Sequence, residues 1–212
     1  WEKLVEPAVK LAAKGFRVSP GLAADLAGRL GSFKKYPATL AQFSQKTGAY
    51  KAGELLVQKD LAETLGRIRD QGAAGFYRGK TAELLVAEMQ RGGGLISQED
   101  LRSYKALERQ PIRGTFGGLD IIAMPPPSSG GVALVEMLNL LEIGGIASAG
   151  FRSSREVHLL AEAMRRAYAD RARHLADTDF VKVPVARLIS KDYARNLSAT
   201  INPQKASRSS PT

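Results

Sequence analysis

The stretch from Ile121 to Glu142 constrains the fold more than any other, because it must hold a buried strand, a rigid turn and a buried helix in succession. Residues 119–124 form a short apolar run, which is typical of a buried strand. Pro125–Pro127 end that strand, since each proline lacks an N–H and fixes its own φ. The following segment, 132–141, is apolar on nearly every side and therefore predicts a buried helix rather than an amphipathic one.

Four small residues join the turn to this helix: Ser128, Ser129, Gly130 and Gly131. Either serine can cap the helix, and the glycines let another backbone come close. A nucleophilic serine needs a base that is itself oriented by a third group, and neither the neighbouring residues nor a Gly-x-Ser-x-Gly elbow supplies one. We therefore interpret the serines as helix caps, at a helix start whose free N–H groups can bind an anion such as a carboxylate.

The rest of the chain predicts a mainly α fold with a small β-hairpin. Residues 106–124 predict two antiparallel strands joined by a glycine turn, and residues 45–57 predict a loop or small hairpin. Apolar periodicity and capping signals predict helices at about residues 6–15, 19–31, 37–43, 59–70, 80–91, 97–103, 153–175 and 192–199. The first of these begins near Glu6, because Pro7 fits poorly inside a helix.

We divide the chain into three parts. Residues 1–105 are a helical lobe, and residues 106–201 hold the hairpin, the strand–turn–helix and the helices that pack on it. Residues 202–212 are rich in Pro, Ser, Lys and Arg and have little to bury, which predicts a flexible linker.

The net charge of +10 raises the question of a nucleic-acid partner. The basic residues are scattered, however, and no basic run alternates with aromatic residues, so we predict a solvated basic surface and no nucleic-acid partner. No apolar run approaches the roughly 20 residues that cross a bilayer, which predicts no membrane span in this segment. The absence of cysteine excludes disulfides and thiolate metal sites.

Two histidines and a group of aspartates are the remaining polar candidates. His158 and His174 share a helix but lie too far apart to bind one metal, and we interpret them as surface or packing residues. Asp170, Asp177 and Asp179 form a loose acidic cluster near the end of that helix. A metal site needs several converging oxygens, so ion pairing and capping are the better interpretation.

The arginines beside this cluster suggest its partners. Arg171 and Arg173 are close enough in sequence to neutralise the aspartates. We expect the stretch 168–171 to tie its helix to a neighbour through an Asp–Arg pair.

The Pro-Pro-Pro-Ser-Ser-Gly-Gly turn followed by Leu-Asn-Leu-Leu-Glu resembles the γ-glutamyltransferase (glutathione hydrolase) family. Further matches follow in order along nearly the whole chain. They are Asp60–Leu65, Gly75–Gly79, Gly93–Ile96 with Asp100–Leu101, Ala167–Arg171 and Asp177–Pro184.

This resemblance implies an N-terminal-nucleophile hydrolase with an αββα core. In the family, one precursor cuts itself into a large and a small subunit, and the freed N-terminal threonine of the small subunit attacks the γ-glutamyl carbonyl. Its own α-amine can serve as the base. The resulting acyl-enzyme is released by water or by an acceptor amino acid or peptide, without a metal or cofactor. The partners implied are the small subunit and a γ-glutamyl small molecule, and the location implied is periplasmic or secreted.

By the same resemblance, this chain is the later part of the large subunit. The Thr-Thr-His-type stretch and the serine and glycine pairs of the small subunit are not in the sequence, and the carboxylate-binding arginine of the family belongs before Trp1. Thr212 does not match the family's cleavage context, so we do not assign it as the nucleophile. We expect no catalytic residue in this chain, no activity from it alone, and at most a place near the substrate for Ser128, Ser129, Gly130 and Gly131.

Two alternatives remain open at this stage. Cephalosporin or glutaryl acylases and poly-γ-glutamate-processing enzymes belong to the same superfamily. In a different class, the chain is a non-catalytic basic helical module that binds an acidic partner.

Overall fold

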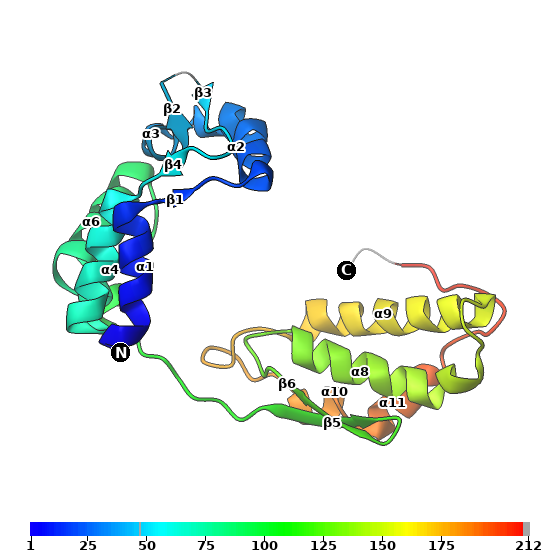
Figure 1. Ribbon diagram of the computed structural model, residues 1–212. Helices are drawn as coiled ribbons and strands as arrows, with labels where there is room; N and C mark the ends of the chain where they lie inside the picture. Colours follow the sequence, from blue (N-terminus) through cyan, green and yellow to red (C-terminus); the bar gives the residue numbers. More distant parts are fainter. Residues whose placement is uncertain (47, 210–212) are drawn as a thin grey trace. The chain divides into compact units, whose positions relative to one another are not determined.

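The computed structural model describes residues 1–46 and 48–209 and divides into two compact units, with the boundary between Ala106 and Leu107. Both units are built mainly of helices, with short antiparallel strand pairs (Figure 1), which confirms the predicted fold class. Among the described residues, no helix combines the length and the apolar character needed to cross a membrane.

The first unit is helical except for two short strand pairs. Strand β1 (Phe16–Arg17) pairs with β4 (Leu55–Leu56), and β2 (Ser44–Gln45) pairs with β3 (Gly48–Ala49). The helices are α1 (Glu2–Lys14), α2 (Pro20–Phe33), α3 (Pro37–Phe43), α4 (Lys59–Gln71), α5 (Ala74–Tyr77), α6 (Gly79–Gly92) and α7 (Gln98–Ser103). The pairing of β1 with β4, across almost forty residues of sequence, has no local signal and was not predicted.

Helix α1 begins earlier than predicted, because tertiary contacts of the residues before Pro7 offset the hydrogen bond that the proline removes. Helix α1 packs on α4, where the indole Nε1 of Trp1 donates to the carbonyl oxygen of Ile68 at 2.9 Å. The carboxylate of Glu6 pairs with Arg69 of α4 at 2.6 Å. The expected start near Glu6 is therefore wrong, and the helix runs through the proline from Glu2.

The second unit is built around helix α8 (Gly130–Ile143), as Figure 1 shows in green. Strand β5 (Ile112–Phe116) pairs with β6 (Leu119–Ala123) in the register Ile112↔Ala123 to Phe116↔Leu119. Gly117 and Gly118 make the turn with φ of 56° and 81°, conformations that favour glycine. The remaining helices are η1 (Ile146–Ser148), α9 (Ser154–His174), α10 (Val185–Leu188) and α11 (Lys191–Ser198).

Helix α8 is buried on nearly every side, as its composition predicted. Its Val132 and Val135 pack with Ile112 of the hairpin and Leu188 of α10. Farther along, Leu140 and Leu141 pack with Ala163 of α9 and Ala194 of α11. The helix is thus covered by the hairpin and by α9, α10 and α11.

The segment after α11, whose composition predicts a flexible linker, contacts helix α9. Its residues 202–209 lie along α9, and both the backbone N–H and the hydroxyl of Ser207 donate to Glu162. Composition offers this segment little that is apolar to bury, and its contacts with α9 are polar, with the buried Glu162 as the central partner. Residues 210–212 lie outside the part of the chain that the structure describes.

Candidate functional site

The turn between β6 and α8 brings two backbone segments into close contact at Gly131. A Cβ at this position would lie 2.1 Å from the carbonyl oxygen of Met124 and 3.0 Å from the Cβ of Ala123. A Cβ at Gly130 would have the Ser128 hydroxyl, at 3.6 Å, as its nearest neighbour, which is an ordinary contact. The predicted close approach of another backbone therefore explains Gly131 but not Gly130.

Ser129 occupies the N-cap position of α8 but does not cap the helix with its side chain. Its φ of −80° and ψ of −16° are helical, whereas a capping serine needs an extended backbone to reach the N–H groups of the first turn. Ser128 accepts a long bond, 3.4 Å, from the N–H of Gly130. The prediction of a helix cap is therefore wrong for Ser129. For Ser128, this long hydrogen bond is the contact with the start of the helix that the structure describes.

The hydroxyl of Ser129 instead accepts a hydrogen bond from Nε of Arg171 on α9, at 2.9 Å. A guanidinium stays protonated and has no acceptor, so it cannot serve as a general base. In the described part of the chain, no histidine or carboxylate is hydrogen-bonded to either serine. This geometry anchors the turn to α9 and does not activate a nucleophile.

The residue before Arg171 makes the second anchor of α9. Asp170 is buried and accepts a hydrogen bond from the hydroxyl of Tyr193 on α11, at 2.5 Å. Burial, together with this bond to Asp170, raises the pKa of Tyr193 to about 12. The expected Asp–Arg pair is therefore wrong, because Asp170 binds a tyrosine and Arg171 binds a serine.

Glu136 of α8 lies beside Asp170 and is 1% exposed. Within residues 1–46 and 48–209, no hydrogen-bond partner reaches its buried Oε1. Burial, reinforced by the neighbouring Asp170, raises the pKa of Glu136 to about 8. In the sequence, residues 132–141 are apolar on nearly every side, and this pattern assigned no role to Glu136. A lone carboxyl at a position that must be buried was the signal that could have found it.

The acidic loop after α9 is held by an arginine far away in the sequence. Both carboxylate oxygens of Asp179 lie 2.7 Å from Nη2 of Arg109, and Asp177 accepts from the N–H of Asp179 at 2.9 Å. The hydrogen bonds to Asp179 raise the pKa of Arg109. The ion-pair and capping interpretation is confirmed for these aspartates, but the partner is Arg109 and not Arg171 or Arg173. Among the described residues, no three carboxyl or imidazole groups are arranged to hold a metal ion.

The two histidines of α9 both make packing contacts. Nε2 of His158 lies 2.9 Å from the carbonyl oxygen of Asn202, and Nε2 of His174 lies 3.1 Å from the guanidinium of Arg187. Both contacts tie α9 to later parts of the chain. Thr212, which was not assigned as a nucleophile, lies outside the described residues.

Comparison with known proteins places this geometry in a family. The family described as Gamma-glutamyltranspeptidase matches residues 1–212. A glutathione hydrolase proenzyme from Pseudomonas sp. (strain A14) is 46% identical over 206 residues, covering 97% of this chain and 36% of that protein. The Acylase ACY 1 proenzyme from Pseudomonas sp. (strain SE83) is 44% identical over 204 residues, covering 96% of this chain and 37% of that protein.

The fold agrees with a solved relative. The crystal structure of Helicobacter pylori gamma-glutamyltranspeptidase superposes with a TM-score of 0.92 at 44% identity, covering 98% of this chain and 60% of that one. The chain spans about a third of the length of the curated relatives that it matches.

Proposed function

This chain belongs to the gamma-glutamyltranspeptidase family, and on that premise we propose that it is the later portion of the large subunit of an enzyme that cleaves γ-glutamyl amides such as glutathione. The reaction passes through an acyl-enzyme, which water or an acceptor amino acid or peptide resolves. The observation that carries the proposal is the match of the whole chain to this family, over a fold that superposes on a solved member.

The nucleophile of this reaction belongs to the small subunit, which the same precursor provides after cutting itself. A freed N-terminal threonine carries its own base, the α-amine, and so needs no histidine from this chain. The contacts of Ser128 and Ser129 support this division, since their partners within the described residues are a guanidinium and a backbone N–H. The role of this chain is to build and support the wall around the site.

An apolar stripe on α9 supports a partner that covers this unit. Val157, Leu160, Met164 and Tyr168 follow the helical period, and their exposed fractions run from 39% to 60%. An exposed apolar stripe of this kind, on a unit that has its own buried core, is typical of a face that another part of the protein covers. We assign that part to the remainder of the precursor.

The residues at the start of α8 stay candidates for lying near the substrate. The N–H groups at this helix end can bind a carboxylate. Gly130, where packing leaves room for a side chain, is the position at which a substitution would report on binding rather than on folding.

The test uses the full-length precursor that contains this chain. We expect mass spectrometry to show two polypeptides, the smaller one beginning with threonine, and the processed protein to hydrolyse glutathione. Retention of a single uncut species without hydrolysis would refute the proposal. The location, periplasmic or secreted, is part of the same proposal and is tested by cell fractionation.

The second candidate is an acylase of the cephalosporin or glutaryl type, favoured by the 44% identity to the Acylase ACY 1 proenzyme. A side-by-side assay with glutathione and a glutaryl amide separates the two. Faster turnover of the glutaryl amide would assign the acylase activity. Membership of an enzyme family favours both over the basic binding module.

A further inference from the structure

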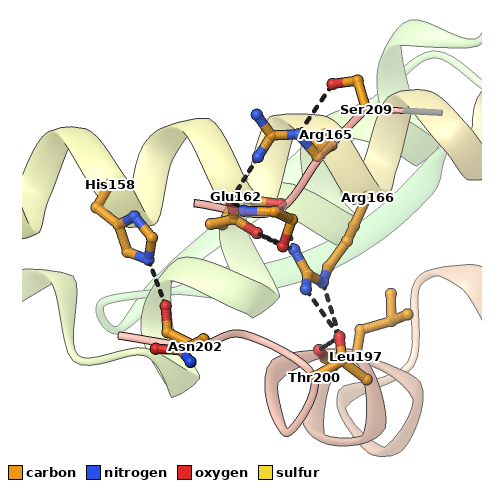
Figure 2. Close-up of polar contacts among 9 residues, drawn as sticks. His158, Glu162, Arg165, Arg166, Leu197, Thr200, Asn202 and Ser209 are labelled. Carbon is orange, nitrogen blue, oxygen red and sulfur yellow. Dashed lines mark hydrogen bonds and ion pairs between the residues drawn. The ribbon is translucent and has the colours of Figure 1, made fainter. Parts of the chain in front are cut away.

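A buried carboxylate on α9 binds the segment that follows α11. The side chain of Glu162 is fully buried in the middle of the helix. Oε1 accepts the backbone N–H of Ser207 at 2.9 Å, and Oε2 accepts the hydroxyl of the same residue at 2.6 Å. Arg165 and Arg166 lie on the next turn of α9, and each forms an ion pair with one of the two carboxylate oxygens of Glu162 (Figure 2).

Glu162 is ionised in this position. Burial raises the pKa of its carboxyl, but the bonds from Ser207 and Arg166 outweigh that effect and lower the pKa to about 2. A buried carboxylate that lost its partners would be strongly destabilising, so the partners are bound tightly.

Further contacts hold the same segment along α9, as Figure 2 shows. Nε2 of His158 lies 2.9 Å from the carbonyl oxygen of Asn202, and Nη2 of Arg166 donates to the hydroxyl of Thr200 at 2.8 Å. Nε of Arg165 donates to the hydroxyl of Ser209 at 3.0 Å. The segment is thus bound at intervals from the end of α11 to the last described residues.

The double bond from Ser207 also fixes the register of this segment. Glu162 accepts both the backbone N–H and the hydroxyl of one residue, and neither neighbour of Ser207 has a hydroxyl, since they are Ala206 and Arg208. A slip by one residue would leave one bond to a buried charge unmade, which is costly. If this segment only had to cover the surface of α9, its register along the helix would not need to be fixed in this way.

We propose that Glu162 is a positioning residue for self-cleavage of the precursor. By binding Ser207, it fixes the point from which the chain runs on toward the cleavage site. This inference rests on the proposed function, in which such a cleavage occurs.

Release of Ser207 would leave residues 203–209 held, within the described part of the chain, only by the contacts at their two ends, His158 with Asn202 and Arg165 with Ser209. The cost of closing a flexible loop rises with its length, and each doubling of the stretch between the last anchored residue and the cleavage site would slow an intramolecular reaction by about threefold. Loss of the orienting contact adds to this, since small misplacements of reacting groups slow reactions further. We therefore expect self-cleavage to slow by about threefold or more.

The experiment follows the conversion of full-length precursors into subunits by mass spectrometry. Glu162→Gln and Ser207→Ala are compared with wild type, with the exposed Glu108→Gln as the matched control. Ser207→Thr, which keeps both donors, is the conservative rescue. We expect slow conversion in Glu162→Gln and Ser207→Ala, and conversion at the wild-type rate in Glu108→Gln and Ser207→Thr.

A second arm bypasses the cleavage by making the two subunits as separate polypeptides, the smaller one starting at its threonine. Here Glu162→Gln and Ser207→Ala should hydrolyse glutathione within about twofold of wild type, because no cleavage is needed. Wild-type conversion rates in both variants would overturn the proposal, and so would equal losses in the two arms, which would show a purely structural role. A wild-type precursor that never cuts itself would refute the proposed function first, and this inference with it.

Discussion

Replacement of Glu136 by glutamine should make the protein more stable at neutral pH while changing its stability little in mild acid. Glu136 is 1% exposed, and burial beside Asp170 raises its pKa from 4.5 to about 8. Between these two pH values the folded protein keeps a proton that the unfolded chain releases. Stability is therefore lost as the pH rises through this window and is fully present below it.

The magnitude follows from the size of the shift. Each pKa unit corresponds to about 1.4 kcal/mol, so the free energy of unfolding should fall by about 3 kcal/mol between about pH 5 and about pH 7.5 because of this one carboxyl. Glutamine keeps the shape of the side chain but cannot ionise. The difference in stability between Glu136→Gln and wild type should therefore grow by about that amount over the same interval.

The measurement is urea unfolding of the full-length protein at the two pH values, for wild type, Glu136→Gln and the exposed control Glu108→Gln. The control should follow wild type at both. If the stabilities of Glu136→Gln and wild type differ by the same amount at both pH values, Glu136 is not held protonated. In that case the argument from burial is refuted.

Three further predictions test the contacts described above. Gly131→Ala should lower the free energy of unfolding by about 1–3 kcal/mol through overpacking, whereas Gly130→Ala should leave it unchanged within about 0.5 kcal/mol, both measured by urea unfolding. Tyr193→Phe removes the hydroxyl that binds buried Asp170 and should cost about 1–3 kcal/mol in the same assay, and an unchanged midpoint would show that this bond is dispensable. Glu162, whose pKa is lowered to about 2, stabilises the fold above its ordinary pKa of 4.5, so wild type should lose more stability than Glu162→Gln as the pH falls below that value.

Much of the second unit could be predicted because its signals are local. The apolar character of residues 132–141 on nearly every side required burial, and glycines 117 and 118 marked the hairpin turn. Ser153 marked the start of α9 and does accept the N–H of Glu156 at 3.0 Å. Ser153 and Glu156 have the spacing of a capping box, but the Glu156 carboxylate accepts the N–H of Arg152, so that the reciprocal bond to Ser153 is absent from the described contacts.

The polar contacts of the site could not be predicted, because their partners lie far apart in the sequence. Ser207 is 45 residues from Glu162, and Asp179 is 70 residues from Arg109. Arg171 and Arg173 were expected to be the partners of the aspartates because they are neighbours in the sequence, and no sequence pattern indicated Arg109. Which polar groups meet is decided by the packing of α9 on α8 and α11, and single-residue patterns carry no information about that packing.

The two anchors of α9 also govern how that helix can turn. Asp170 and Arg171 are consecutive and so point about 100° apart around the helix axis. One is bound to Tyr193 and the other to Ser129. Because the two hydrogen bonds lead to different elements, a rotation of α9 about its axis in either direction would stretch one of them. The rotational position of α9 therefore sets the position of the proline turn before α8. A substitution at Tyr193 would remove one of the two anchors and so change the position of Ser129, to which Tyr193 is linked through α9.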